Sequence, residues 1–274
     1  KAPRTDRHPS GNLLTDDVDP KRQVLPMTTE IGRMTALDLL ARFRTRELSP
    51  VEATRAALDC IAEENPRLNA FCLVDSEAAM RQARQSEARW LKNEPTGLVD
   101  GIPVSIKDLV LTAGWPTLRG SLAIARDQTW EEDAPVVARL REHGAVLLGK
   151  TTTPEFGWKG VTDSLLTGIT RNPWNHDMTP GGSSGGAAVA LASGMGALAI
   201  GTDGAGSIRI PASFTGVFGL KATHGLVAAH PPSSIGTMAN PGPMARTVAD
   251  CALMLRVIGQ FDPRDPYAQP LPTP

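Results

Sequence analysis

Three short segments of the chain hold residues whose types and spacing could do chemistry. In the first, residues 101–108 (Gly-Ile-Pro-Val-Ser-Ile-Lys-Asp), Lys107 ends an apolar run. Ammonium groups rarely follow the apolar residues of a buried strand, and burial can lower a lysine pKa far enough to make the amine a general base. A lysine that reaches solvent or pairs with Asp108 would need no chemistry, and this segment alone favours that simpler interpretation.

The second segment is a glycine-rich loop around two serines. In residues 180–186 (Pro-Gly-Gly-Ser-Ser-Gly-Gly), four glycines flank Ser183 and Ser184. Glycine lets the backbone adopt conformations closed to other residues and approach a ligand closely. Such a loop before a helix could also bind phosphate, but this one lacks the glycine spacing of the nucleotide-binding motifs. A loop that approaches a ligand and a purely structural turn therefore remain about equal alternatives for this segment.

The third segment is a glycine-rich turn that follows a predicted strand. Residues 201–212 (Gly-Thr-Asp-Gly-Ala-Gly-Ser-Ile-Arg-Ile-Pro-Ala) place Ser207 where the next helix is expected to begin. Successive backbone N–H groups of such a turn can converge on one point, which suits a nucleophile with a backbone oxyanion hole. A serine that only caps the helix is the simpler alternative, and this segment alone favours it.

Alternating strands and helices must position these segments. Apolar runs predict strands at 102–106, 145–148, 197–200 and 217–220. Helical patterns predict helices at 134–143, 187–193 and 248–258. Apolar strands that alternate with helices indicate a layered α/β fold around a mostly parallel or mixed sheet.

The N-terminal part of the chain is predicted to be helical. Thr35 with Asp38, and Ser49 with Glu52, have the spacing of N-terminal capping boxes. Three helices are expected here, at 35–46, from residue 50 onwards and at 75–90. We therefore expect residues 31–95 to form a helical layer without chemistry of its own.

Taken together, the three segments resemble the amidase signature family. The spacing also fits, since Lys107 lies 76 positions before Ser183 and Ser207 lies 24 positions after it. Supporting matches are Gly-Lys-Thr at 149–151, Pro-Glu-Phe at 154–156, Arg-Asn-Pro-Trp at 171–174 and Gly-Leu-Lys-Ala-Thr at 219–223. The resemblance covers roughly residues 33–260.

The resemblance implies a serine hydrolase mechanism with a Ser–Ser–Lys triad and no cofactor. It makes Ser207 the nucleophile that carries the acyl group, and Lys107 the general base. Ser183 would transfer the proton between them and would follow a cis peptide bond after Gly182.

The resemblance also assigns supporting roles. Backbone N–H groups of Gly204, Ala205, Gly206 and Ser207 would form the oxyanion hole. Ser184, Asp203 and Arg209 would hold the catalytic loops by hydrogen bonds.

Two positions depart from the pattern of the family. Ala205 replaces one of the two glycines that usually precede the nucleophile, and alanine resists positive φ. Met178 stands where an arginine often precedes the serine loop. We therefore expect a slightly altered turn at Ala205 and the loss of one loop-anchoring ion pair at Met178.

The implied fold is an α/β/α domain around a mixed, twisted sheet. Residues 1–30 are expected to form an irregular arm, with Met27 as a possible natural start. Residues 31–274 would form the amidase signature domain, with the helical layer 31–95 followed by a catalytic α/β core at 96–274. Family members are usually much longer, so the resemblance implies that a C-terminal part is missing from this chain.

The composition excludes several other classes of protein. The formal net charge is −1 and the basic residues are scattered, so direct binding to nucleic acid is not expected. No apolar run is long enough to span a membrane, and the polar start does not resemble a signal peptide. The widely spaced Cys60, Cys72 and Cys251 are expected to be reduced core thiols of a cytoplasmic protein. No residue pattern predicts a metal site.

Three functions follow as hypotheses, in decreasing order of support. The first is hydrolysis of a small-molecule carboxamide through an acyl-enzyme on Ser207. The second is the glutamine-hydrolysing subunit of a tRNA-dependent amidotransferase, against which the Thr-Pro-Glu-Phe-Gly-Trp run at 153–158 counts. The third is a truncated, non-catalytic binding module. A homo-oligomer and a separate C-terminal fragment are both compatible with the sequence.

Overall fold

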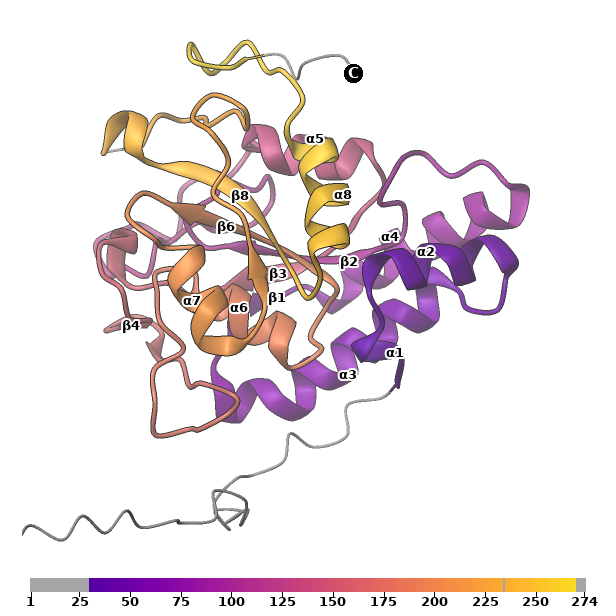
Figure 1. Cartoon of the computed structure of the whole chain (residues 1–274), viewed down its shortest axis with the longest axis horizontal. Helices are drawn as coiled ribbons and strands as arrows, with labels where there is room; N and C mark the ends of the chain where they lie inside the picture. Colours follow the sequence, from indigo (N-terminus) through magenta and orange to yellow (C-terminus); the bar gives the residue numbers. More distant parts are fainter. Residues whose placement is uncertain (1–29, 234, 270–274) are drawn as a thin grey trace, which may run out of the picture.

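A six-stranded mixed sheet forms the centre of the computed structural model, which describes residues 30–233 and 235–269 (Figure 1). The strands are β1 (Phe71–Val74), β2 (Pro103–Lys107), β3 (Val146–Thr151), β6 (Leu198–Asp203), β7 (Phe218–Gly219) and β8 (Asn240–Ala245), in the order β1-β3-β2-β6-β8-β7. Strand β2 pairs in parallel with β3 and β6, whereas β1, β8 and β7 run antiparallel to their neighbours. The predicted α/β fold around a mixed sheet is confirmed. The predicted N-terminal arm lies outside the described residues apart from Glu30.

Helices pack on both faces of the sheet (Figure 1). On one face lie α2 (Ala36–Thr45), α5 (Pro135–Glu142) and α8 (Val248–Ile258). On the other lie α3 (Pro50–Leu68), α4 (Ser76–Lys92), α6 (Gly185–Ala192) and α7 (Arg209–Thr215). The smaller elements are α1 (Glu30–Arg33), β4 (Asp163–Ser164), β5 (Gly168–Ile169), and the 3-10 turns Glu155–Gly157 and Gly236–Met238. No described helix is long and apolar enough to cross a bilayer.

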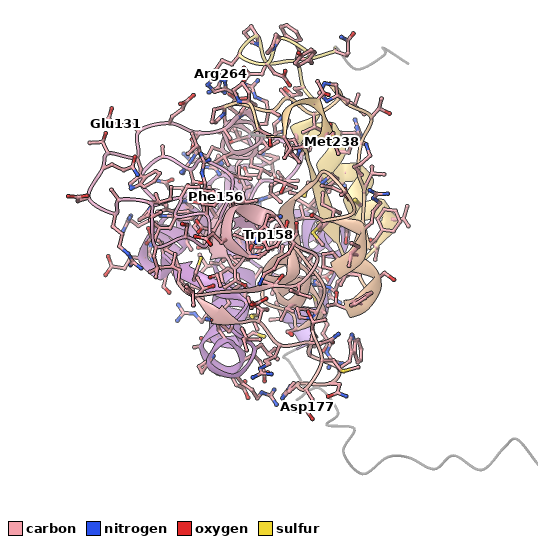
Figure 2. The ribbon with its side chains drawn as sticks, turned by 90° about the vertical axis from the view of Figure 1, so that its left-hand side faces the viewer. Glu131, Phe156, Trp158, Asp177, Met238 and Arg264 are labelled. Carbon is pink, nitrogen blue, oxygen red and sulfur yellow. The ribbon has the colours of Figure 1, made fainter. Side chains whose placement is uncertain are left out.

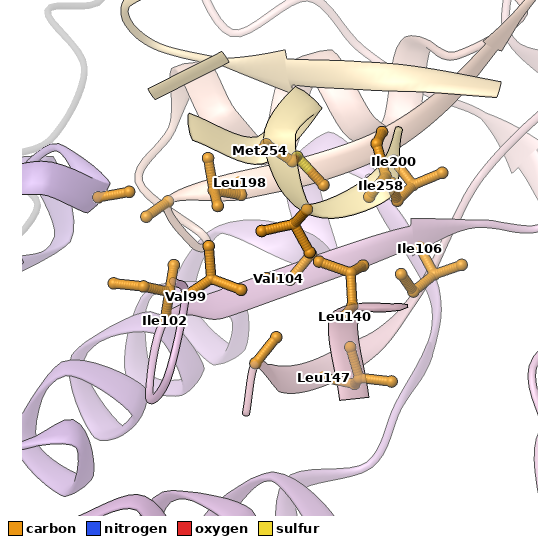
Figure 3. Packing of buried hydrophobic residues seen from close by; sticks show 14 of the residues in the cluster. Val99, Ile102, Val104, Ile106, Leu140, Leu147, Leu198, Ile200, Met254 and Ile258 are labelled. Carbon is orange, nitrogen blue, oxygen red and sulfur yellow. The ribbon is translucent and has the colours of Figure 1, made fainter. Parts of the chain in front are cut away.

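Strand β2 separates the apolar core from the polar site. Successive side chains of a strand point to opposite faces, and Val104 and Ile106 point to the core under α5 and α8 (Figure 3). Both side chains are completely buried there, and each such burial stabilises the fold by roughly 1.5–3 kcal/mol. The same alternation turns Ser105 and Lys107 to the opposite face. The core thus fixes the direction in which Lys107 points.

The predicted capping boxes are present. The Thr35 hydroxyl accepts a hydrogen bond from the N–H of Asp38, and Ser49 does the same for Glu52, while each acid accepts one back. These reciprocal bonds satisfy N–H groups that have no partner within a helix, so α2 and α3 begin where the sequence predicts.

Two strands of the sheet were not expected from the sequence. Strand β1 lies within the predicted helical layer and pairs with β3. Strand β8 carries Pro241 and Pro243 but is fully buried between β6 and β7. Proline normally argues against an inner strand, because it cannot donate to the hydrogen-bond ladder. The prediction for the cysteines is partly wrong, since all three are free but Cys72 is exposed.

Candidate active site

Lys107 lies at the C-terminal end of β2 and is completely buried. Its Nζ is 2.7 Å from Ser183 Oγ, 2.8 Å from Ser184 Oγ and 2.9 Å from Thr202 Oγ1. The alternative of a lysine that reaches solvent is therefore wrong. Pairing with Asp108 is wrong as well, because the Asp108 carboxylate forms its ion pair with Lys150.

The surroundings of Lys107 favour a neutral amine. Burial lowers the pKa of Lys107 well below its usual value, and the negative charge of Asp203 only partly opposes this. A neutral amine donates two hydrogen bonds and accepts one, and three hydroxyl groups can supply that combination. This arrangement can therefore take up a proton from a serine.

The loop of Ser183 and Ser184 is held in a tight space at the start of α6. The peptide bond between Gly182 and Ser183 is cis. A Cβ atom at Gly186 would lie 2.4 Å from Thr152 Oγ1, so only glycine fits there. The Ser184 hydroxyl accepts a hydrogen bond from the N–H of Thr202 at 3.3 Å, in addition to the one from the amine of Lys107. The loop is thereby fixed to the strand that carries the next segment.

The turn after β6 is organised by the buried carboxylate of Asp203. It accepts hydrogen bonds from the backbone N–H of Gly206 at 2.7 Å and of Ile208 at 3.2 Å, and from the guanidinium of Arg209 at 2.9 and 3.0 Å. Burial opposes ionisation of Asp203, but these donors hold its pKa below the usual value. A stably charged carboxylate thus ties both sides of the turn together.

The turn bears on two expectations. Its only positive φ within 204–207 is at Gly206 (115°), so Ala205 takes a backbone conformation that alanine readily adopts. The N–H of Gly206 is donated to Asp203, which removes it from the expected oxyanion hole. The N–H groups of Gly204, Ala205 and Ser207 remain as candidates.

Ser207 is not a helix cap. Helix α7 begins at Arg209, its N-cap position is Ile208, and the N–H groups of its first turn bind Asp203. Ser207 lies just before the helix and is partly exposed. Its carbonyl accepts the N–H of Ser184 at 3.0 Å, which joins the two serine segments.

The structure adds residues that were not predicted from the sequence. Thr202 supplies the third hydroxyl at Lys107, and Thr162 binds the serine loop through the carbonyl of Gly181 at 2.8 Å. Gly157 passes close to the site, because a Cβ atom there would lie 3.3 Å from Ser183 Oγ. Thr202 could have been found, since it follows the predicted strand at 197–200; nothing in the sequence marks Thr162.

The loop around Met178 is anchored by an amide. The side chain of Asn172 donates to the carbonyl groups of Thr179 at 3.3 Å and Phe214 at 3.0 Å, and its backbone N–H donates to the carbonyl of Met178 at 3.1 Å. The side chain of Met178 is exposed. The loop is therefore anchored by hydrogen bonds rather than by an ion pair at this position.

The site lies beside an apolar surface. Phe156, Trp158 and Met238 share one face of the molecule (Figure 2), and their side chains are 48%, 77% and 58% exposed. Gly157, which approaches Ser183, lies between the two aromatic residues. A substrate that reaches the serines from this side would meet aromatic groups.

Comparison with known proteins shows the family of this chain. A family model described as Amidase matches residues 52–274. This chain belongs to the amidase family. The indoleacetamide hydrolase of Bradyrhizobium diazoefficiens is 41% identical over 249 residues, which cover 88% of this chain and 47% of that protein. A glutamyl-tRNA(Gln) amidotransferase subunit of Acidothermus cellulolyticus is also 41% identical, over 90% of this chain and 49% of that protein.

Solved structures of the family share the fold. A bacterial aryl acylamidase of the amidase signature family superimposes with a TM-score of 0.82 at 33% identity, covering 89% of this chain and 51% of that one. A 6-aminohexanoate cyclic dimer hydrolase complexed with substrate gives a TM-score of 0.81 at 33% identity, over 90% of this chain and 50% of that one. This member of the amidase family spans about half the length of the relatives that it matches.

Proposed function

We propose that this protein takes part in the hydrolysis of a carboxamide C–N bond, with Ser207 as nucleophile. The observation that carries the proposal is the completely buried Lys107, whose Nζ lies within 2.9 Å of three hydroxyl groups. A lysine whose pKa is lowered by burial can act as a base near neutral pH.

In the first step, Ser207 Oγ attacks the carbonyl carbon of the amide. Its proton passes to Ser183 Oγ, while the proton of Ser183 passes to Lys107 Nζ. The backbone N–H groups of Gly204, Ala205 and Ser207 would stabilise the negative oxygen of the tetrahedral intermediate. The C–N bond then breaks, and the leaving nitrogen takes the proton back from Lys107 through Ser183.

In the second step, water attacks the ester on Ser207. The same two residues accept the proton of water and return it to the oxygen of Ser207. The products are a carboxylic acid and ammonia or an amine. Ser184, Asp203 and Arg209 act as positioning residues, because their hydrogen bonds hold the two serine loops.

Relatives and the apolar surface together suggest the substrate class. The similar proteins include an indoleacetamide hydrolase and an aryl acylamidase. The exposed Phe156 and Trp158, which flank Gly157 in the sequence near Ser183, would suit an apolar or aromatic amide. Hydrolysis of glutamine within an amidotransferase remains the second candidate, because subunits of that enzyme are equally similar in sequence.

The test compares wild type with Ser207→Ala on two substrates, an aromatic primary amide (indole-3-acetamide) and glutamine. Wild type should release ammonia faster from the aromatic amide, and the variant should lose about 1000-fold or more while keeping its circular dichroism spectrum. A fluorophosphonate should label wild type at Ser207 and not at Ser184. Activity that survives Ser207→Ala would contradict the proposal, and a preference for glutamine would favour the amidotransferase.

A further inference from the structure

Besides Lys107, a second completely buried lysine lies at the end of the same pair of strands. Lys150 is on β3, next to β2, and none of its surface is exposed. It is no part of the triad, and an unpaired buried ammonium group is costly. Its contacts therefore indicate what it does.

A β-bulge decides where Lys150 points. Val104 is paired with Leu147, but Ser105 is paired with Gly149, so one residue of β3 is left over. Beyond the bulge, Lys150 is in register with Ile106, and Thr151 with Lys107. Without the bulge the two lysines would lie side by side on one face; with it they lie on opposite faces.

Gly149 is what permits this bulge. Its φ is 155°, and a Cβ atom there would lie 2.0 Å from the carbonyl oxygen of Leu73. No other residue fits without moving β1. The backbone is thus built to direct Lys150 away from Lys107.

On its own face, Lys150 binds the turn that follows Lys107. Its Nζ donates to the carbonyl of Val110 and to Thr117 Oγ1, both at 2.7 Å, and lies 3.6 Å from Asp108 Oδ1. The N–H of Val110 in turn donates to the carbonyl of Lys107 at 3.0 Å. The buried ammonium group of Lys150 thus holds Val110, whose N–H fixes the backbone carbonyl of Lys107.

Asp108 extends this network along the loop. Its carboxylate accepts the N–H of Leu118 at 3.3 Å and of Gly120 at 3.4 Å. Its own N–H donates to the carbonyl of Thr151 at 3.0 Å. The loop from 108 to 120 is therefore fastened to the sheet at both of its ends.

We infer that Lys150, with Asp108 and Thr117, is a positioning group for the catalytic base: it fixes the end of β2 so that Lys107 Nζ stays within reach of its three hydroxyl partners. This inference rests on the proposed function. Removing the cation leaves the carbonyl of Val110 without its strongest donor and the carboxylate of Asp108 without a counter-charge. The backbone at the end of β2 is then no longer fixed, and the side chain of Lys107 is no longer held toward Ser183.

The test measures how fast Ser207 displaces fluoride from a fluorophosphonate, followed by intact mass. Four proteins are compared: wild type, Lys150→Met, Lys107→Ala and the double variant. Lys150→Met should slow labelling by about tenfold or more. In the Lys107→Ala background it should cause no further loss beyond about twofold, because its effect acts through Lys107. A double variant that loses the product of the two single effects would overturn the inference.

Arg246 provides a matched control. It is another mostly buried cation that donates to backbone carbonyls, of Leu191 near the end of α6 at 3.1 Å and of Gly196 just before β6 at 2.7 Å. Arg246→Met should destabilise the fold but label within about threefold of wild type when fully folded. If it slows labelling as much as Lys150→Met, the effect is general loosening and the inference is wrong.

Thr117→Val covers the case in which Lys150→Met does not fold. It removes one partner of the Lys150 amine and keeps the buried ion pair. It should slow labelling less than Lys150→Met and, again, only when Lys107 is present. Wild-type rates for Thr117→Val would overturn the inference. Failure of wild type to be labelled at Ser207 would instead reject the proposed function.

Discussion

At the scale of single residues, the proposed chemistry depends on keeping one amine neutral. Lys107 has three hydroxyl partners, and its nearest acidic neighbour in sequence, Asp108, is bound to a different lysine. A carboxylate beside Lys107 would hold the proton that a base must be free to accept. The polar but uncharged shell is therefore part of the proposed mechanism.

Thr202 offers a test of that shell. Thr202→Val keeps the shape of the side chain but removes one hydroxyl from Lys107 Nζ, which leaves Ser183 and Ser184 as partners. A lost hydrogen bond at a buried polar group costs about 1–3 kcal/mol, so kcat should fall by about 5- to 150-fold. Thr202→Ser, which keeps a hydroxyl, serves as control in steady-state kinetics. Equal kcat values for the two variants would show that the hydroxyl is dispensable.

The pH dependence of activity should report Lys107. Because the base works when deprotonated, kcat/KM should rise with pH through the pKa of Lys107, which burial places well below its usual value. Separate replacements of the four described histidines should leave this rise of kcat/KM with pH unchanged, because their contacts lie away from Lys107. The side chains in contact are Gln260 for His143, Asn240 for His224 and Glu132 for His230. Loss of this rise in any histidine variant, His176 included, would require a histidine base instead.

At the scale of elements, close packing between loops and helices sets the geometry of the site. Helix α6 begins directly after Ser184, and its first turn packs so tightly that Gly185 and Gly186 have no room for a Cβ atom. The turn between β6 and α7 is in addition held by the buried carboxylate of Asp203. The loop of Ser183 is thus positioned by sterics, and the turn before Ser207 by hydrogen bonds to a buried charge as well.

Gly186→Ala should therefore destabilise the fold. The new Cβ atom would lie 2.4 Å from Thr152 Oγ1 and 2.5 Å from the carbonyl of Ala70, and overpacking of this kind costs about 1–3 kcal/mol or more. Gly160→Ala is the matched control, because its nearest neighbouring atom would be 3.9 Å away. Urea unfolding should separate the two variants, and a Gly186→Ala protein as stable as Gly160→Ala would contradict this account.

At the scale of the whole molecule, the fold carries two buried lysines on opposite faces of one sheet. Each is hydrogen-bonded within a polar cluster at the C-terminal end of the parallel strands, and we propose that Lys107 serves the chemistry and Lys150 the structure. Burial of an ammonium group lowers stability at neutral pH, so the stability of the molecule should depend on pH in the alkaline range.

Lys150 allows the sign of this dependence to be worked out. Burial lowers its pKa from 10.5 to about 8, against the opposing charge of Asp108. Between these values the unfolded chain binds the proton and the folded chain does not, so the free energy of unfolding rises with pH. The stability of wild type relative to Lys150→Met should therefore grow between pH 8 and 10, by up to about 1.4 kcal/mol per pH unit. Denaturant titrations at several pH values would measure it, with exposed Lys92→Met as control. A constant or shrinking difference would contradict it.

The sequence alone determined the local features whose causes are local. Capping pairs mark the starts of α2 and α3 because the bonds that begin a helix join residues three positions apart. Lys107, Ser183 and Ser207 could be combined in one hypothesis because each lies in a short motif of consecutive residues that resembles the family.

The tertiary structure decided the rest, because contacts between segments distant in sequence leave no local pattern. Strand β8 has its place only because β6 and β7 flank its prolines. Thr202 becomes a partner of Lys107 because β2 pairs with β6. The N–H of Gly206 donates to Asp203 and is therefore not available to the expected oxyanion hole. In the sequence, Lys150 is only one residue of a supporting motif. The bulge that directs its side chain away from Lys107 is seen only in the register of β2 and β3. Side-chain direction in a sheet depends on register, and register is a property of two strands together.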